Sequence, residues 1–190
     1  GLVRYQAGRF TAMNRQDRLL NYQMTAALLD REDNVWFGTD GGGVRRISEG
    51  VFRKFGMEDG LNSNLAKSFL EDEQGRIWIS TKDRGINVLA QDEVVASYTI
   101  ADGLGGDNIV SSFEDREGQF WFASYNGTLT RYADGRFRVF DDADGLTCDA
   151  VFCVTQGPQG QRWVGTSNGI FVMQGESFQR VWSQDNGLAD

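Results

Sequence analysis

Aspartates at a fixed distance from tryptophan are the most regular chemically active residues of this sequence. Asp30, Asp72 and Asp115 each stand six residues before a tryptophan. Repeated carboxylates can act as general acids and bases or bind a hard cation. The fourth copy has Gly157 at this position, however, and a catalytic carboxylate is not expected to give way to glycine. We therefore expect tight turns, in which the aspartate accepts backbone N–H groups and a following glycine supplies positive φ.

Other reactive residue types are scarce. The sequence has no histidine and only two cysteines, Cys148 and Cys153, so zinc and haem sites lack their usual ligands. Extended chain would hold the two cysteine Cα atoms roughly 16 Å apart, too far for a disulfide, and we expect both thiols to be free and partly buried. Segment 142–145 lacks a full calcium loop, and glycines 41–43 lack the Lys-Ser/Thr of a phosphate loop. We expect no metal, no cofactor and no catalytic residue.

Charge and hydropathy argue against two further classes of partner, nucleic acids and membranes. The 190 residues contain 19 Lys plus Arg against 27 Asp plus Glu, a net charge of −8. Such a chain repels phosphate backbones, so we expect no nucleic-acid partner. No apolar run approaches the roughly 20 residues that cross a bilayer, and we expect no membrane contact by this segment.

Four tryptophans reveal the elements that position these residues. Trp36, Trp78, Trp121 and Trp163 stand 42, 43 and 42 residues apart, the first three at the centre of an apolar triplet and the last between Arg162 and Val164. The units share a tight turn, built on Asp in the first three, then the Trp strand, a Gly-rich turn, two more strands and a closing Asp-Gly-Leu, which reads Asn-Gly-Leu in the last. Repeats of roughly 40 to 45 residues with four short strands are typical of β-propeller blades. No segment sustains a helical apolar period, so the fold class is all-β with antiparallel four-stranded blades.

The repeat also divides the chain. We expect a half-blade at residues 1–19 and four blades at about 20–61, 62–104, 105–146 and 147–190. Outer strands occur five times but inner strands four times. The chain is therefore either four closed blades with a spare half-blade or about four and a half blades of a larger ring, and we favour the open arc. An arc exposes apolar faces, so we expect it to associate with a second copy or with the rest of a parent propeller. A parent propeller is expected because Gly1 falls in the middle of a repeat.

We expect the tryptophans to serve the packing between blades. Three consecutive apolar residues indicate a strand covered on both faces, so we expect all four indoles to be structural and to lie between blades. The outermost strands carry large apolar residues at matching positions, which are Met13 in the first copy and then Phe55, Tyr98, Phe140 and Trp182. Arginine and lysine interleave with them at Arg53, Lys54, Arg136 and Arg138, where charge protects a sheet edge from unwanted pairing.

The combined pattern resembles a known family. The run from Asp30 to Arg46, with its Trp, Gly-Thr and Gly-Gly-Val-x-Arg, resembles the two-component regulator propeller repeat, and the Asp-Gly-Leu followed by Asn62 to Asn64 is similar to it too. This resemblance implies a non-enzymatic sensor: the periplasmic or other extracytoplasmic input module of a bacterial hybrid histidine kinase or diguanylate cyclase, usually built from seven-bladed rings. The family has no uniform ligand residues to carry over.

The order of the strands predicts which loops bind a ligand. The loop between blades and the loop between strands two and three emerge on one face, and loops on rigid scaffolds commonly bind ligands. The candidates are Asn64, Lys82, Arg84, Asn108, Tyr125 and Asn126. They suit a polar ligand such as an oligosaccharide, with Lys82 and Arg84 available for a carboxylate or sulfate. Two alternatives remain: a propeller lyase of the streptogramin-lyase type, whose chemistry relies on a histidine, and a protein-interaction scaffold without a small ligand.

Overall fold

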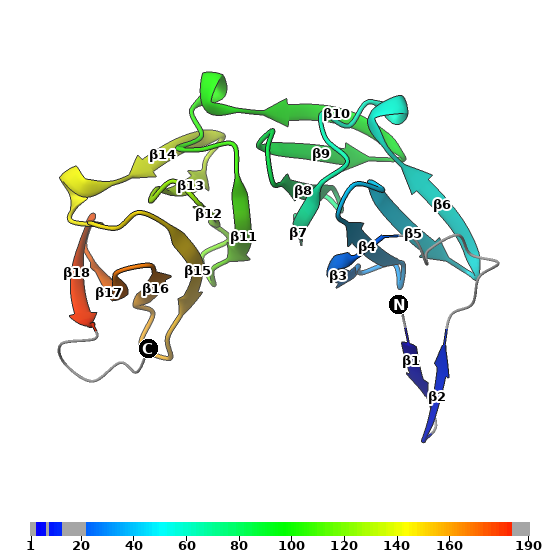
Figure 1. The fold of residues 1–190 in the computed structure, drawn as a ribbon, viewed down its shortest axis with the longest axis horizontal. Coiled ribbons are helices and arrows are strands. Elements are labelled where there is room, and N and C mark those ends of the chain that lie inside the picture. Colours follow the sequence, from blue (N-terminus) through cyan, green and yellow to red (C-terminus); the bar gives the residue numbers. More distant parts are fainter. Residues whose placement is uncertain (1–2, 7, 13–21, 184–190) are drawn as a thin grey trace.

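The computed structural model describes residues 3–6, 8–12 and 22–183. Strands dominate, with short turns of 3-10 helix between blades. Four sheets of four antiparallel strands succeed one another along the chain and fan out around a common axis (Figure 1). The sheets form an open arc and do not close, which confirms the all-β propeller architecture and the arc. The seven-blade count of a complete ring stays a prediction.

Each blade is a meander in which neighbouring strands pair antiparallel. The first blade contains β3 (Met24–Leu29), β4 (Val35–Thr39), β5 (Val44–Ser48) and β6 (Val51–Phe55). The second contains β7 (Ala66–Glu71), β8 (Ile77–Thr81), β9 (Ile86–Ala90) and β10 (Glu93–Tyr98). The third contains β11 (Ile109–Glu114), β12 (Phe120–Ser124), β13 (Leu129–Ala133) and β14 (Arg136–Phe140). The fourth contains β15 (Val151–Gln156), β16 (Arg162–Thr166), β17 (Gly169–Gln174) and β18 (Ser177–Trp182).

The first strand of every blade lies nearest the axis, as predicted. β3 contacts β7, β7 contacts β11, and β11 contacts β15. Each of these strands carries a bulge just after it begins, at Thr25, Lys67, Val110 and Phe152. A bulge increases the local twist of a strand and re-aims its side chains. The inner strands therefore enter the axis region bent, close to the loops that join one blade to the next.

The recurring Asp-Gly-Leu closes each of the first three blades with one turn of 3-10 helix. These turns are η2 (Met57–Asp59), η3 (Ile100–Asp102) and η4 (Asp142–Asp144). The aspartate side chain accepts the backbone N–H at the start of its turn, and the glycine after it has a φ near +100°, at 98° in Gly60 and 109° in Gly103. The leucine then enters the core, where Leu61, Leu104 and Leu146 are at most 3% exposed. Each residue of the triplet thus has a structural task.

Three tryptophans fill three interfaces between blades. Trp36 packs with Phe69 and Ile79 of the second blade, and Trp78 packs with Phe120 and Phe122 of the third. Trp121 packs with Val151, Val154 and Val164 of the fourth blade. All three indoles are at most 2% exposed. The predicted interblade role is therefore confirmed for Trp36, Trp78 and Trp121.

Trp163 corrects the prediction that all four indoles lie between blades. It is half-buried, and its ring stacks on Trp182 of its own blade at a centroid distance of 5.4 Å. Trp182 is 45% exposed, whereas its counterparts Phe55 and Phe140 are fully buried. The physical reason is that no further blade covers this side of the fourth sheet within the described residues. The fourth blade therefore shows an uncovered apolar face.

The first predicted unit appears as a separate hairpin. β1 (Val3–Gln6) pairs antiparallel with β2 (Arg9–Ala12), where the outer half of a preceding blade is predicted. This hairpin is drawn apart from the four blades, next to the first of them (Figure 1). Met13, which the sequence assigns to an outermost strand, lies outside the described residues. So do Leu19 and Leu188, which occupy the place of the closing leucine.

Candidate ligand-binding loops

Hydrogen bonds between consecutive loops bring the predicted site residues to one face of the arc. The loop after β8 binds the loop before β7, because Lys82 N donates to Leu65 O at 2.9 Å. The same contact recurs from Tyr125 N to Asn108 O at 2.9 Å and from Ser167 N to Ala150 O at 2.9 Å. The two loop series therefore form one continuous rim, which we call the loop face. Its backbone is fixed, as a binding surface on a rigid scaffold requires.

Asn64 uses its polar groups to join elements of this rim. Its Oδ1 accepts the Met57 N–H at 3.0 Å, and its backbone carbonyl accepts the N–H groups of Gly41 and Gly43. Gly43 also has a φ of 74° and leaves no room for a Cβ, which would meet the Phe55 carbonyl at 2.3 Å. Asn64 is thus a structural bridge between the first blade and the loop after it.

The other two asparagines differ from each other. Asn126 donates from Nδ2 to Gly105 O at 2.8 Å and accepts the Thr128 hydroxyl at 2.8 Å, so it joins two loops. Asn108 keeps a buried Oδ1 without a hydrogen-bond partner among the described residues. A buried acceptor without a partner costs free energy unless water or a ligand satisfies it. Asn108 is therefore the one asparagine of the three whose side-chain oxygen the described residues leave unsatisfied.

Lys82 and Arg84 carry the accessible positive charge of the loop face. Both side chains are exposed, and neither has an ion-pair partner within the part of the chain that the structure describes. The backbone of this loop is held, since Arg84 N donates to Thr81 Oγ1 at 3.1 Å and Arg84 O accepts from Asn62 Nδ2. A fixed backbone with two free cations suits a carboxylate or sulfate.

Tyr125 belongs to an aromatic pair that the sequence did not predict. Its ring is 57% exposed and lies 6.3 Å, centroid to centroid, from the ring of Phe152, which is 46% exposed. Phe152 is the bulge residue of β15, so the bulge turns it out of the blade core. The sequence shows only that Phe152 is the second residue of its strand. Its exposure can be inferred from that position only when the strand is known to carry a bulge there.

A polar pocket lies between the third and fourth blades on the same face. Its volume is about 400 Å³, and its walls come from the two loop series, at Asp142, Thr147, Cys148, Asp149, Ser167 and Asn168. Burial raises the pKa of the Cys148 thiol, which disfavours the reactive thiolate. Cys148 and Cys153 are both free, as predicted, but Cys153 is exposed rather than partly buried. None of the six predicted site residues lines this pocket.

The turn aspartates have a structural task. Asp72 Oδ1 accepts the N–H groups of Gln74 and Arg76, at 3.1 and 2.9 Å, which closes the predicted turn. Its Oδ2 accepts the indole N–H of Trp78 at 2.9 Å, a bond that the sequence did not predict. Burial raises the pKa of Asp72, but the hydrogen bonds from Trp78 and Arg76 outweigh it and hold this pKa below its ordinary value. An aspartate held ionised in this way cannot act as a general acid.

Two features bear on cofactors and membranes. Within residues 3–6, 8–12 and 22–183, no three His, Cys, Asp or Glu side chains come together as a metal-binding group. Across those residues, no helix has the length and apolar character that a bilayer span requires.

Two stretches of the chain match a known family. Residues 60–83 and 103–126, which run from the closing turn of one blade to the loop face of the next, match the two-component regulator propeller family. The match covers part of the second blade and part of the third. No curated protein matches this chain significantly.

Solved structures share this fold. An extracellular domain from B. thetaiotaomicron, assigned in one structure to a hybrid two component system and in another to a one component system, has a TM-score of 0.68 at 24% and 25% identity. The alignments cover 84% and 86% of this chain, which spans about a quarter, 24% and 25%, of that domain. A catalytically inactive virginiamycin B lyase from Staphylococcus aureus has a TM-score of 0.65 at 15% identity, over 86% of this chain and 58% of the lyase. The likeness to the lyase concerns the fold alone.

Proposed function

We propose that this chain is part of a non-enzymatic sensor, the ligand-binding propeller of an extracytoplasmic, periplasmic input module in a bacterial two-component or diguanylate cyclase signalling protein. The observation that carries the proposal is the family match in two successive blades, which includes the loop face at Lys82 and Tyr125. The B. thetaiotaomicron relatives support it, because they are extracellular domains assigned to signalling systems. The chain aligns with only a quarter of that domain, so the activity of a whole protein is part of the proposal.

The ligand that we propose is a polar one, an oligosaccharide that carries a carboxylate or sulfate. The two unpaired cations, Lys82 and Arg84, supply charge-assisted hydrogen bonds on a surface whose backbone is fixed. The exposed pair of Tyr125 and Phe152 adds an apolar surface at the next blades. Such a ligand acts as a signal only if it binds one arrangement of the module more tightly than another.

A binding experiment tests this proposal directly. The chain is titrated with a panel of neutral, uronic-acid and sulfated oligosaccharides by calorimetry and thermal shift. A ligand at 100 times its dissociation constant should stabilise the fold by about 2.7 kcal/mol. The variant Lys82→Ala/Arg84→Ala should lose the charged ligands and keep the wild-type circular dichroism. Arg9→Ala/Arg136→Ala removes two exposed charges elsewhere and is the matched control, so equal losses in both variants would contradict a site at the loop face.

The lyase alternative has one supporting observation, the shared fold. The solved lyase is catalytically inactive when one histidine is replaced by alanine. The 190 residues of this chain contain no histidine. This chain therefore does not itself supply that residue, and incubation with a streptogramin B antibiotic, followed by mass spectrometry, should show no conversion.

The uncovered face of the fourth blade supports our proposal of a macromolecular partner. Three equivalent faces are each covered by the inner strands of the next blade, and the face with Trp163 and Trp182 is not. We propose that it packs on another propeller blade, from a second copy or from a longer parent chain. Sedimentation of the isolated chain over a range of concentrations should show self-association that Trp182→Lys weakens.

A further inference from the structure

The outermost strand of the second blade differs from the other three outermost strands. β10 is the last strand of its sheet and pairs only with β9, so its second edge is free among the described strands. The equivalent strands β6, β14 and β18 all carry arginine or lysine, at Arg53, Lys54, Arg136, Arg138 and Arg180. β10 has none: its exposed residues are Glu93, Val95 and Ser97. Positive charge is a common protection against strand pairing, and this edge lacks it; its one irregularity is a bulge at Val95, between Val94 and Ala96.

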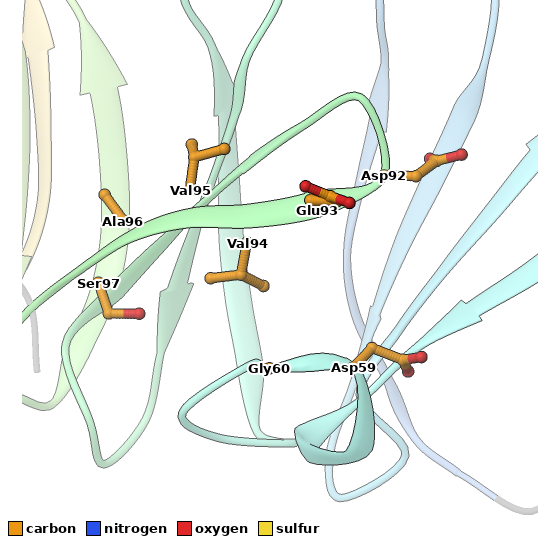
Figure 2. Close-up of a pocket in the computed structure, with 8 residues that line it drawn as sticks. All are labelled: Asp59, Gly60, Asp92, Glu93, Val94, Val95, Ala96 and Ser97. Atoms are coloured by element: carbon orange, nitrogen blue, oxygen red, sulfur yellow. The ribbon is translucent and has the colours of Figure 1, made fainter.

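A groove runs along this edge. It has a volume of about 580 Å³, and its lining runs without a gap from Asp92 to Ser97, with Asp59 and Gly60 opposite. Figure 2 shows β10 crossing above the turn that holds Asp59 and Gly60, with Val94 directed into the space between them. A Cβ on Gly60 would make only ordinary contact with the Val94 side chain, at 3.6 Å, so the glycine leaves space for a methyl group beside Val94. The volume lies within the roughly 300 to 1,000 Å³ of ligand pockets.

The charge of the groove selects the kind of chain that fits. Three carboxylates line it, at Asp59, Asp92 and Glu93, and no lysine or arginine does. Asp92 already pairs with Arg46 and Arg53 at its outer side. Asp59 and Glu93 have no ion-pair partner among the described residues, and Asp59 accepts only the Gly56 N–H through Oδ2. Two exposed carboxylates on opposite walls are thus available to pair with a cationic side chain.

We propose that β10 is a docking edge for an extended basic peptide segment, which pairs with the strand as a fifth member of the second blade. The backbone of the strand supplies the hydrogen bonds, and side chains supply the specificity, as in other cases of strand addition. Lysine or arginine of the peptide lies between Asp59 and Glu93, and small apolar residues contact Val95 and Ala96. A second copy of this chain is disfavoured, because edge-to-edge pairing would bring two such acidic rims together on molecules of net charge −8.

The test uses a defined probe, the fluorescein-labelled peptide Lys-Val-Thr-Val-Thr-Val-Lys, with anisotropy as the readout. Two further peptides act as controls: one with glutamate at both ends, and one with alternate backbone amides N-methylated. We expect binding of the lysine peptide only, and slower amide hydrogen exchange in residues 93–98 when it is bound. The absence of lysine-peptide binding at about 1 mM, or equal binding of either control peptide, would overturn the proposal.

Matched variants locate the site on the protein. Val95→Lys places a cation on the exposed valine of β10, and Val51→Lys does the same on β6, where Val51 is equally a surface residue of an outermost strand. We expect Val95→Lys to weaken the lysine peptide about tenfold and Val51→Lys to leave it unchanged. Glu93→Gln, which keeps the shape of the side chain, should weaken it about threefold. If Val95→Lys fails to fold, Glu93→Lys replaces it.

Two outcomes of the variant series count against the docking edge. Equal affinities of Val95→Lys and wild type would show that the peptide binds elsewhere. Sedimentation gives the second: a wild-type dimer that Val95→Lys abolishes and Val51→Lys preserves would show that the occupant is a second copy of the chain rather than a basic peptide.

Discussion

The indole Nε1 of Trp121 donates a hydrogen bond of 2.7 Å to Oδ2 of Asp115, six residues earlier in the chain. The same bond joins Trp78 to Asp72 at 2.9 Å and Trp36 to Asp30 at 2.7 Å. In each pair the other carboxylate oxygen, Oδ1, closes the hairpin between the first two strands. One side chain therefore couples a surface turn to the packing between two blades, and this coupling explains the fixed spacing of six.

Replacing Asp115 with alanine should destabilise the fold by about 2 to 4 kcal/mol. The change leaves the Trp121 indole, two backbone N–H groups and the Arg162 guanidinium without their shared acceptor. Urea unfolding monitored by tryptophan fluorescence measures it. Asp149→Ala is the matched control, because that aspartate is exposed and its carboxylate has no hydrogen-bond role in the described structure. Equal effects of the two changes would refute the anchoring role.

The three anchored aspartates should make the fold sensitive to acid. Burial raises their pKa values, but hydrogen bonds from the indoles, from backbone N–H groups and, at Asp115, from Arg162 lower each pKa below its ordinary value. The unfolded chain therefore binds more protons in acid, so the stabilisation is complete above about pH 4 and is lost as pH falls through the lower folded pKa values. Unfolding free energy, measured by urea titration between pH 6 and pH 2, should fall with acid, and less steeply in Asp72→Asn.

Glu114 should have the opposite sign. The pKa of this carboxyl is raised by burial and by the nearby negative charges of Glu73 and Asp115, which together outweigh the lowering effect of Arg31. A raised folded pKa favours the protonated form, so its contribution to stability is present below the unfolded value of about 4.3 and is lost as pH rises through the folded pKa. Glu114→Gln should therefore be more stable than wild type at pH 7 and similar to it near pH 3. A loss of stability at pH 7 in the same urea assay would contradict this.

The sequence predicted the features that depend on one repeat. The period, the antiparallel blades, the inner position of the first strand and the turn around Asp72 result from spacing and turn chemistry, and the structure confirms them. The aromatic residue of the outermost strand was predicted only as a matching position. In the structure Phe55, Tyr98, Phe140 and Trp182 each stack on the tryptophan of their own blade, at 5.4 to 5.7 Å.

Relations between neighbouring blades were harder to predict, because a repeat describes only the features that its copies share. Trp163 occupies the same place in its repeat as Trp121, and its exposure depends on whether another blade packs against it. The candidate site shows the same limit. Topology correctly placed its loops on one face, but the structural task of Asn64 and the exposure of Phe152 depend on cross-loop hydrogen bonds and a bulge that no local pattern reveals. Whether the six candidates bind a ligand stays a prediction.

Asp33 offers a test of the turn itself. It stands where the other copies have glycine, and it adopts the same left-handed backbone, with a φ of 62° against 75° in Gly75 and 74° in Gly118. That conformation costs a non-glycine residue up to about 1 kcal/mol, although aspartate tolerates it better than most. Asp33→Gly should therefore raise the unfolding free energy by about 0.5 kcal/mol. Glu32→Gly, one residue earlier and also exposed, has no left-handed φ to relieve and should lower it.

An interior tryptophan and the tryptophan at the end of the arc should differ in how much stability their loss costs. Trp121 is fully buried between the third and fourth blades and bonded to Asp115, so Trp121→Ala should cost about 3 to 5 kcal/mol. Trp163 is half-buried, and Gly157 stands where an aspartate would accept its indole N–H, so Trp163→Ala should cost only about 1 to 2 kcal/mol. Urea unfolding monitored by far-ultraviolet circular dichroism, which does not depend on the deleted fluorophore, compares them. Equal losses of unfolding free energy at low protein concentration would mean that the Trp163 face is covered in solution, because removing an indole costs this much only when its whole surface is packed.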